Sequence, residues 1–130
     1  MPRRTVIEAA DLPHHTNPIP TAVKIGNLVF TSALFGHDPK TQQLPDDPDA
    51  QVSNVFRAVR RVMEEAGGSV SDIGKMTVYL RDMQLRDLVN REWLKMFPEE
   101  DDRPVRHTMP MATAAGSALI QVELIAVLAS

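Results

Sequence analysis

Apolar and polar residues alternate along the last clearly patterned stretch of the chain. Apolar side chains occupy every second position from Ile120 to Leu128, and Gln121 and Glu123 lie between them. Successive side chains of a β-strand point to opposite faces, so this segment predicts a strand with one buried face and one face that carries a polar pair. Another strand is predicted at residues 103–109, where Pro104 keeps the residue before it extended.

Two other segments show helical spacing. From Val52 to Ala66 the apolar residues recur every three or four positions, and Asp47-Pro48 supplies an N-cap followed by proline at the first helical position. Gly67-Gly68 is expected to end this helix in the left-handed conformation. A second helix is predicted from about Met83 to Phe97.

The remaining strands follow from the same patterns. They are predicted at residues 5–8, 22–25, 28–35 and 75–80, with Gly26-Asn27 as a hairpin turn. The resulting order is strand, strand, strand, helix, strand, helix, strand, strand. It predicts an α+β domain over residues 1–130, with one mixed six-stranded sheet, two right-handed crossovers and both helices on one face. Since the other face carries apolar as well as polar positions, we expect a homo-oligomer that covers it.

Composition excludes several classes of function. The net charge is −3 and the basic residues are scattered, which argues against nucleic acid as the main partner. The chain has no cysteine, so disulfides and thiolate metal sites are excluded. No apolar run is long enough to span a bilayer and no apolar leader follows the first residues, so we expect a cytoplasmic protein with no membrane partner.

The candidate chemistry lies on the two strands described first. Arg106 and Thr108 point to one side of their strand, and if the strand pairs with residues 120–128, Arg106 and Glu123 lie near each other on the open face. His107 is expected to face away from Arg106, so a pocket role for it needs a bend. The adjacent His14 and His15 point apart on an extended chain, which favours a loop pair over a metal site.

Several segments, in the same order and at the same spacing, resemble the Rid family (RidA/YjgF-like reactive intermediate deaminases). The resemblance covers nearly the whole chain from about Ala22. The segments that carry it are Gly26–Ser32, Asp38–Thr41, Glu65–Gly68, Asp72–Asp82, Val89-Asn90, Arg103–Arg106 and Val122–Ala126.

This resemblance implies a chorismate-mutase-like fold and a homotrimer whose sheets form an inner barrel, with clefts at the subunit interfaces. It implies hydrolysis of enamine and imine intermediates to 2-oxo acids and ammonia, of the 2-iminobutanoate/2-iminopropanoate type, without metal or organic cofactor. Arg106 matches the arginine that holds the substrate carboxylate, and a planar guanidinium suits that ligand. Glu123 matches the glutamate that handles the attacking water. Backbone groups around Ala33 and Thr108 match segments that orient the water or the imine nitrogen.

The chain departs from the family pattern at several pocket positions. Ile19 replaces a tyrosine, Ala33-Leu34 replaces Gly-Gln, and Thr108 replaces a frequent cysteine. We therefore expect an altered, more apolar pocket wall. The residues predicted to contact substrate are Arg106, Ala33, Leu34, Thr108, Ile19 and His107.

Three alternatives remain at this point. In the first, the substrate is a 2-aminomuconate-type dicarboxylate of aromatic catabolism, with a second positive group supplied by His107, His14 or His15. In the second, the protein is a non-catalytic carboxylate binder or sensor on the same fold. In the third, Arg106 is a structural arginine, and Glu123 serves only to orient it.

Overall fold

The architecture is taken from a computed structural model that describes residues 2–14, 16–111 and 116–129. Both predicted helices are present, together with two short 3-10 helices, η1 and η2. In chain order the elements are β1 Thr5–Ile7, β2 Ala22–Ile25, β3 Leu28–Thr31, β4 Leu34–Phe35, α1 Pro48–Glu65, η1 Val70–Asp72, β5 Ile73–Leu80, η2 Met83–Leu85, α2 Arg86–Met96, β6 Val105–Pro110 and β7 Ile120–Val127.

All the strands form one mixed sheet. Its order is β1-β2-β3-β7-β5-β6, and β4 also pairs with β7. Among the described strands, β5 and β6 form the only parallel hydrogen-bonded pair, and α2 connects them as a crossover. The predicted α+β class and mixed sheet are confirmed. The expected pairing of residues 103–109 with residues 120–128 is wrong, because β5 lies between β6 and β7.

The sheet has seven strands rather than six because the predicted strand 28–35 is broken. Phe30 pairs with Ile125 and Leu34 pairs with Val122. Three residues on one side therefore face two on β7, which is the extra residue of a β-bulge. The Leu124 N–H donates to Thr31 Oγ1 at 3.0 Å, so a side chain replaces the ladder bond lost at the break. The bulge carries residues 32–33 next to Glu123 along β7.

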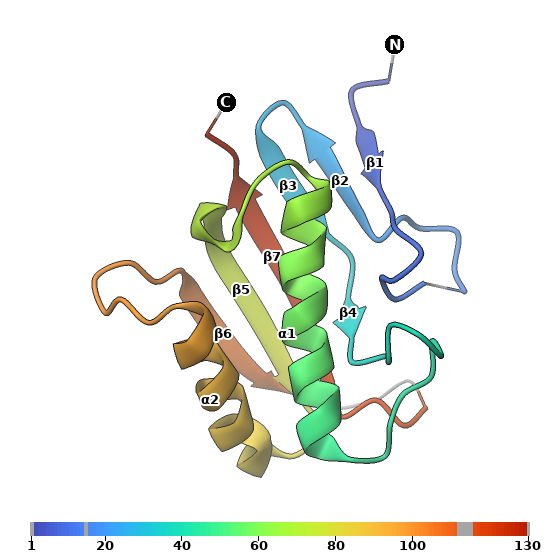
Figure 1. Cartoon of the computed structure of the whole chain (residues 1–130), viewed down its shortest axis with the longest axis vertical. Helices are drawn as coiled ribbons and strands as arrows, with labels where there is room; N and C mark the ends of the chain where they lie inside the picture. The colour runs from blue at the N-terminus through green and yellow to red at the C-terminus, as the bar shows by residue number, and fades with distance from the viewer. Residues whose placement is uncertain (1, 15, 112–115, 130) are drawn as a thin grey trace.

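Both helices lie on the same face of the sheet (Figure 1), as predicted. The side chain of Asp47 caps α1 by accepting from the Asp49 N–H, and Gly67 follows the helix at φ +87°. The core between the layers includes fully buried Leu34, Met63 and Met76. At the edge of this core Gly36 packs so closely on α1 that an added Cβ would lie 2.2 Å from the carbonyl oxygen of Gln51.

The second helix begins later than the sequence predicted. Residues 83–85 form η2, and the carboxylate of Asp82 caps it by accepting from the Gln84 N–H at 2.9 Å. The α-helical turns start at Arg86. Among the described residues, no helix is both long enough and apolar enough to cross a lipid bilayer.

The loop between β1 and β2 is fastened to α1 by Asp11. Asp11 Oδ2 lies 2.6 Å from Arg57 Nη2 and 2.8 Å from Arg61 Nε. Hydrogen bonds from these guanidinium groups hold the pKa of Asp11 well below its usual range.

The face of the sheet opposite the helices carries exposed apolar side chains. Leu28, Ile125 and Val127 are 36%, 41% and 49% exposed, and Val105 and Met109 on the edge strand β6 are 66% and 44% exposed. Large apolar residues gathered on one face favour an interface over a free surface. The homotrimer with an inner barrel remains a prediction that this observation supports.

Candidate active site

Arg106 lies on β6 and faces α2. It is in register with Met76, a fully buried residue of the helix-covered face. Its Nη2 donates to Asn90 Oδ1 of α2 at 2.8 Å, and its Nε donates to Thr108 Oγ1 at 3.0 Å. The guanidinium carbon lies 4.9 Å from the ring centroid of Trp93, which is within cation–π range. We call Arg106, Thr108, Asn90 and Trp93 the arginine half-site.

The guanidinium of Arg106 is held in place but not neutralised. Its contacts in the described part of the chain are all to uncharged groups, and no carboxylate there forms a salt bridge with it. Burial lowers the pKa of Arg106, and the positive charge of Arg86 lowers it further. A half-buried cation without a counter-ion is suited to bind an anion, because binding supplies the missing charge.

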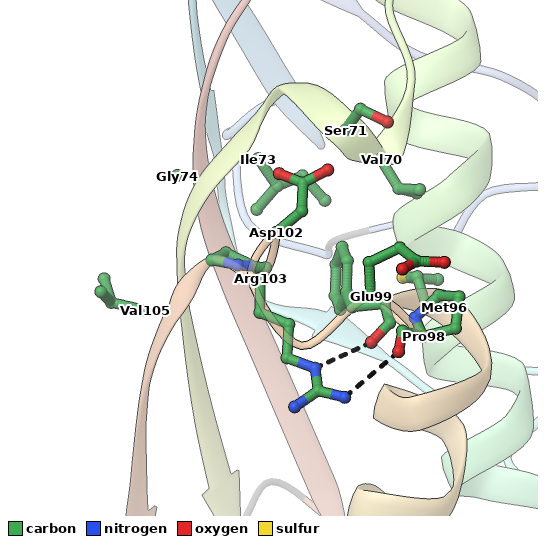
Figure 2. Close-up of a pocket in the computed structure, with 12 residues that line it drawn as sticks. Val70, Ser71, Ile73, Gly74, Met96, Pro98, Glu99, Asp102, Arg103 and Val105 are labelled. Carbon is green, nitrogen blue, oxygen red and sulfur yellow. Dashed lines mark hydrogen bonds between the residues drawn. The ribbon is translucent and has the colours of Figure 1, made fainter.

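Arg103, the other arginine of the Arg103–Arg106 motif, has a different role. It lies beside a hollow of about 300 Å³ between the end of α2 and the beginnings of β5 and β6. Its Nε donates to Phe97 O at 2.9 Å and its Nη2 to Pro98 O at 3.4 Å. Figure 2 draws these two hydrogen bonds of the Arg103 side chain as dashed lines. Arg103 therefore fastens the loop after α2. None of the predicted site residues lines this hollow.

Glu123 lies on the opposite face of the sheet. It is in register with Thr77 of β5, and Tyr79 Oη donates to Glu123 Oε1 at 3.1 Å. This hydrogen bond and the negative charge of the carboxylate raise the pKa of Tyr79. A hollow of about 250 Å³ adjoins the carboxylate and is lined by Phe30, Thr31, Lys75, Thr77, Glu123, Leu124 and Ile125. We call Glu123, Tyr79, Thr77, Lys75 and Thr31 the glutamate half-site.

Arg106 and Glu123 of one chain therefore do not meet. They are separated by β5 and point to opposite faces. The expectation that they lie near each other on the open face is wrong for a single chain. The expectation assumed that β6 and β7 are neighbours. Alternation along a strand determines which residues share a face, but it does not determine which strands are neighbours.

The other residues predicted to contact substrate lie in different parts of the structure. Thr108 belongs to the arginine half-site, and the half-buried Ala33 lies in the bulge next to Glu123. Leu34 is fully buried in the core, so its side chain does not line an open pocket. Ile19, in the loop before β2, is 46% exposed.

His107 faces away from Arg106, as predicted. It is exposed and in register with Thr77, so it shares a row across the sheet with Glu123. His14 lies in the loop between β1 and β2, at the other end of the sheet from β6. His15 and residues 112–115 lie outside the described residues.

Sequence reasoning found some of these partners and missed others. Thr108 was predicted on the same side of its strand as Arg106, and alternation along residues 75–80 puts Tyr79 on the open face with Glu123, although their hydrogen bond was not predicted. The contacts of Arg106 with Asn90 and Trp93 were missed. Trp93 is 9% exposed, and its ring faces the Arg106 guanidinium. The signal for this pair was present in the helical spacing, because Asn90 and Trp93 are three positions apart and so share a helix face.

Comparisons with known proteins bear on the whole chain. The sequence model of the family described as Endoribonuclease L-PSP matches residues 9–128. The 2-iminobutanoate/2-iminopropanoate deaminase of Escherichia coli strain K12 is 31% identical over 122 residues, covering 93% of this chain and 95% of that protein.

Solved structures agree with the sequence comparison. RidA from the Antarctic bacterium Psychrobacter sp. PAMC 21119 superposes with a TM-score of 0.89 at 29% identity, covering 96% of this chain and all of that one. TdcF of E. coli, solved with bound serine, has a TM-score of 0.86 at 30% identity, covering 95% of this chain and 98% of that one.

Proposed function

Because the chain belongs to the Endoribonuclease L-PSP family, the family of RidA and YjgF, we propose that it is a cofactor-free deaminase of carboxylate-bearing imines and enamines. The observation that carries the proposal is the un-neutralised guanidinium of Arg106, held by Asn90, Thr108 and Trp93. A 2-imino acid carries a carboxylate next to its reactive carbon. Arg106 grips that carboxylate and thereby places the carbon.

The reaction is the addition of water to the C=N bond followed by loss of ammonia. Glu123 accepts a proton from water as the water oxygen bonds to the imine carbon, and returns that proton to the nitrogen, which gives a carbinolamine. It then accepts the hydroxyl proton of the carbinolamine and passes it to the nitrogen as the C=O bond forms, the C–N bond breaks and ammonia leaves. The products are a 2-oxo acid and ammonia. An enamine first becomes the imine by gaining a proton at carbon and losing one from nitrogen. Tyr79 holds the Glu123 carboxylate in position through its 3.1 Å hydrogen bond.

The two half-sites are proposed to meet between subunits of a homo-oligomer. Arg106 and Glu123 of one chain are on opposite faces of the sheet, so a cleft that uses both takes each from a different copy. The exposed apolar residues on the open face and on β6 support such contacts. A closed ring of identical subunits then contains one complete cleft at each interface.

RNA cleavage is a poorer match for this chain, although the family description names it. Binding of an RNA backbone needs a basic groove, and single-stranded RNA also needs aromatic residues on which the bases stack. The net charge is −3, and aromatic residues make up only 5% of the sequence. The arginine half-site offers one guanidinium and one indole, which fits a small carboxylate better than a polymer.

The direct test is imine hydrolysis. An amino-acid oxidase generates imines of several side-chain sizes in place, and a nucleophilic trap competes for them. An active protein lowers the yield of trapped imine and accelerates release of the 2-oxo acid. We expect Arg106→Ala to abolish this acceleration and Arg60→Ala, a change of an exposed α1 arginine outside both half-sites, to leave it intact.

A non-catalytic binder on the same fold is the rival, and Glu123→Gln separates the two. Loss of turnover with retained binding of a 2-oxo acid supports the enzyme. Absence of turnover in wild type with every imine would refute the deaminase, and carboxylate binding that still depends on Arg106 would then identify a binder.

A further inference from the structure

The helix face that meets Arg106 holds a third residue besides Asn90 and Trp93. Arg86 is the first residue of α2, four positions before Asn90 and seven before Trp93. Residues at this spacing lie on one face of a helix, with neighbouring Cβ atoms roughly 6 Å apart. Arg86 therefore continues the row of side chains along which the Arg106 guanidinium lies.

In the described part of the chain, Arg86 lacks a carboxylate partner of the kind that Arg57, Arg61 and Arg91 have. On the same helix, Arg91 Nη2 lies 2.7 Å from Asp49 Oδ1, and Arg91 Nε lies 2.9 Å from Glu92 Oε2. Within the described ranges no salt bridge joins Arg86 to a carboxylate, and the side chain is exposed.

The acidic residues nearest in sequence do not replace such a partner. The carboxylate of Asp82 accepts the Gln84 N–H that caps η2. Asp87 is the next residue along α2, where side chains diverge around the helix instead of sharing a face.

The charge of Arg86 acts on Arg106. It is the second cause, after burial, of the lowered pKa of Arg106. Two like charges in one neighbourhood, neither paired with a carboxylate in the described structure, oppose folding instead of supporting it. Such an arrangement is accounted for if an anion with two negative groups binds there.

We propose that Arg86 is a specificity-determining residue that binds a second acidic group of the substrate, so that the preferred imine or enamine is a dicarboxylate. The proposal rests on the deaminase function and narrows its substrate class. Arg106 holds the carboxylate beside the reactive carbon, and Arg86 holds the distal one. Arg106 is bonded to Asn90, one helical turn from Arg86, and that separation suits two carboxylates joined by a short carbon chain.

This assignment differs from the histidines that the sequence offered for the second group. Within one chain, His107 is on the opposite face from Arg106 and His14 is near the opposite edge of the sheet, so neither lies beside Arg106 in the same subunit. Arg86 needs no rearrangement, because it already lies on the helix face that contacts Arg106.

The test compares two imines on four proteins. D-Aspartate oxidase acting on D-glutamate supplies a dicarboxylic imine, and D-amino-acid oxidase acting on D-2-aminobutanoate supplies a monocarboxylic one. The ratio of the two kcat/KM values is measured for wild type, Arg86→Gln, Arg86→Lys and Arg60→Gln. Arg60 is a matched control, since it is an exposed helix arginine that lines neither half-site.

We expect wild type to prefer the dicarboxylic imine and Arg86→Gln to lower the ratio about tenfold, mainly through KM, as loss of one partly screened charged hydrogen bond predicts. Arg86→Lys should restore part of the preference, because it returns the charge without the fork. Arg60→Gln should keep the wild-type ratio. A ratio that does not change in Arg86→Gln overturns the inference and leaves the deaminase function standing.

Calorimetry with 2-oxoglutarate and 2-oxobutanoate separates the two proposals if no imine is hydrolysed. Wild type that turns over neither imine refutes the deaminase. If wild type then binds 2-oxoglutarate more tightly than 2-oxobutanoate, and Arg86→Gln loses that difference, the result supports a two-anion site on a binding protein. Equal binding of the two oxo acids by wild type overturns the two-anion site.

Discussion

A cleft assembled from two subunits predicts that two inactive variants restore each other. Arg106→Ala removes the carboxylate grip and Glu123→Gln removes the proton acceptor. In a ring where each site takes Arg106 from one chain and Glu123 from the next, a mixed oligomer contains some interfaces at which both residues are intact.

The expected recovery follows from the arrangement alone. In random one-to-one mixing, an interface receives an intact Arg106 with probability one half and an intact Glu123 with probability one half. About a quarter of the sites are then complete, whatever the number of subunits in the ring. Mixing wild type with Arg106→Ala should instead leave about half of the sites complete, because every chain then carries Glu123.

The assay is imine hydrolysis after the two variants are unfolded together and refolded, or after they are produced together in one cell. Wild type treated in the same way sets the full activity, and each variant treated alone sets the background. A mixture that stays at the background while refolded wild type recovers would refute the shared cleft. Activity in Glu123→Gln alone would refute the proton-transfer role of that residue.

Three further predictions concern stability and ionisation. Asp11→Asn should lower the free energy of unfolding at pH 7 by about 1 kcal/mol, after allowance for solvent screening. Because the folded-state pKa of Asp11 is depressed, this contribution is complete above the unfolded-state pKa of about 4 and is lost as the pH falls from there toward the folded-state value, so the variant and wild type should converge in acid denaturant titrations. Gly36→Ala should cost about 2 kcal/mol or more in thermal or urea unfolding, because its Cβ would lie 2.2 Å from the Gln51 carbonyl oxygen, and unchanged stability would contradict that close packing. Tyr79 is the single tyrosine, so ultraviolet titration reports it directly; its raised pKa should fall toward about 10 in Glu123→Gln, and an identical titration in both proteins would contradict the contact.

Local chemistry made most of the elements predictable. Asp47-Pro48 and Gly67 marked the ends of α1, and Gly26, at φ +59°, marked the hairpin turn between β2 and β3. Alternation along β7 predicted its buried residues, including Val122 and Leu124. Each of these inferences depends on residues close together in sequence, where steric and hydrogen-bonding preferences act directly.

The site was harder to predict because it depends on which strands are neighbours. The parity of Arg106, His107 and Thr108 was predicted correctly, yet the insertion of β5 between β6 and β7 reversed the expected meeting of Arg106 with Glu123. The break after Thr31 was also missed, since most residues from Leu28 to Phe35 are apolar or β-branched and the segment reads as one strand. Both errors concern pairings between distant segments, which the pattern along one segment does not encode.

The central position of β7 affects the order in which the chain is built. This strand follows every other element in the sequence, yet it pairs with β3, β4 and β5 in the middle of the sheet. On a ribosome, the β2–β3 hairpin and the β5–β6 pair would wait as separate halves with unpaired edges until β7 emerged to join them. Completion of the sheet therefore waits until β7 has emerged, and aggregation through those open edges is the hazard that a nascent chain of this topology faces in the interval.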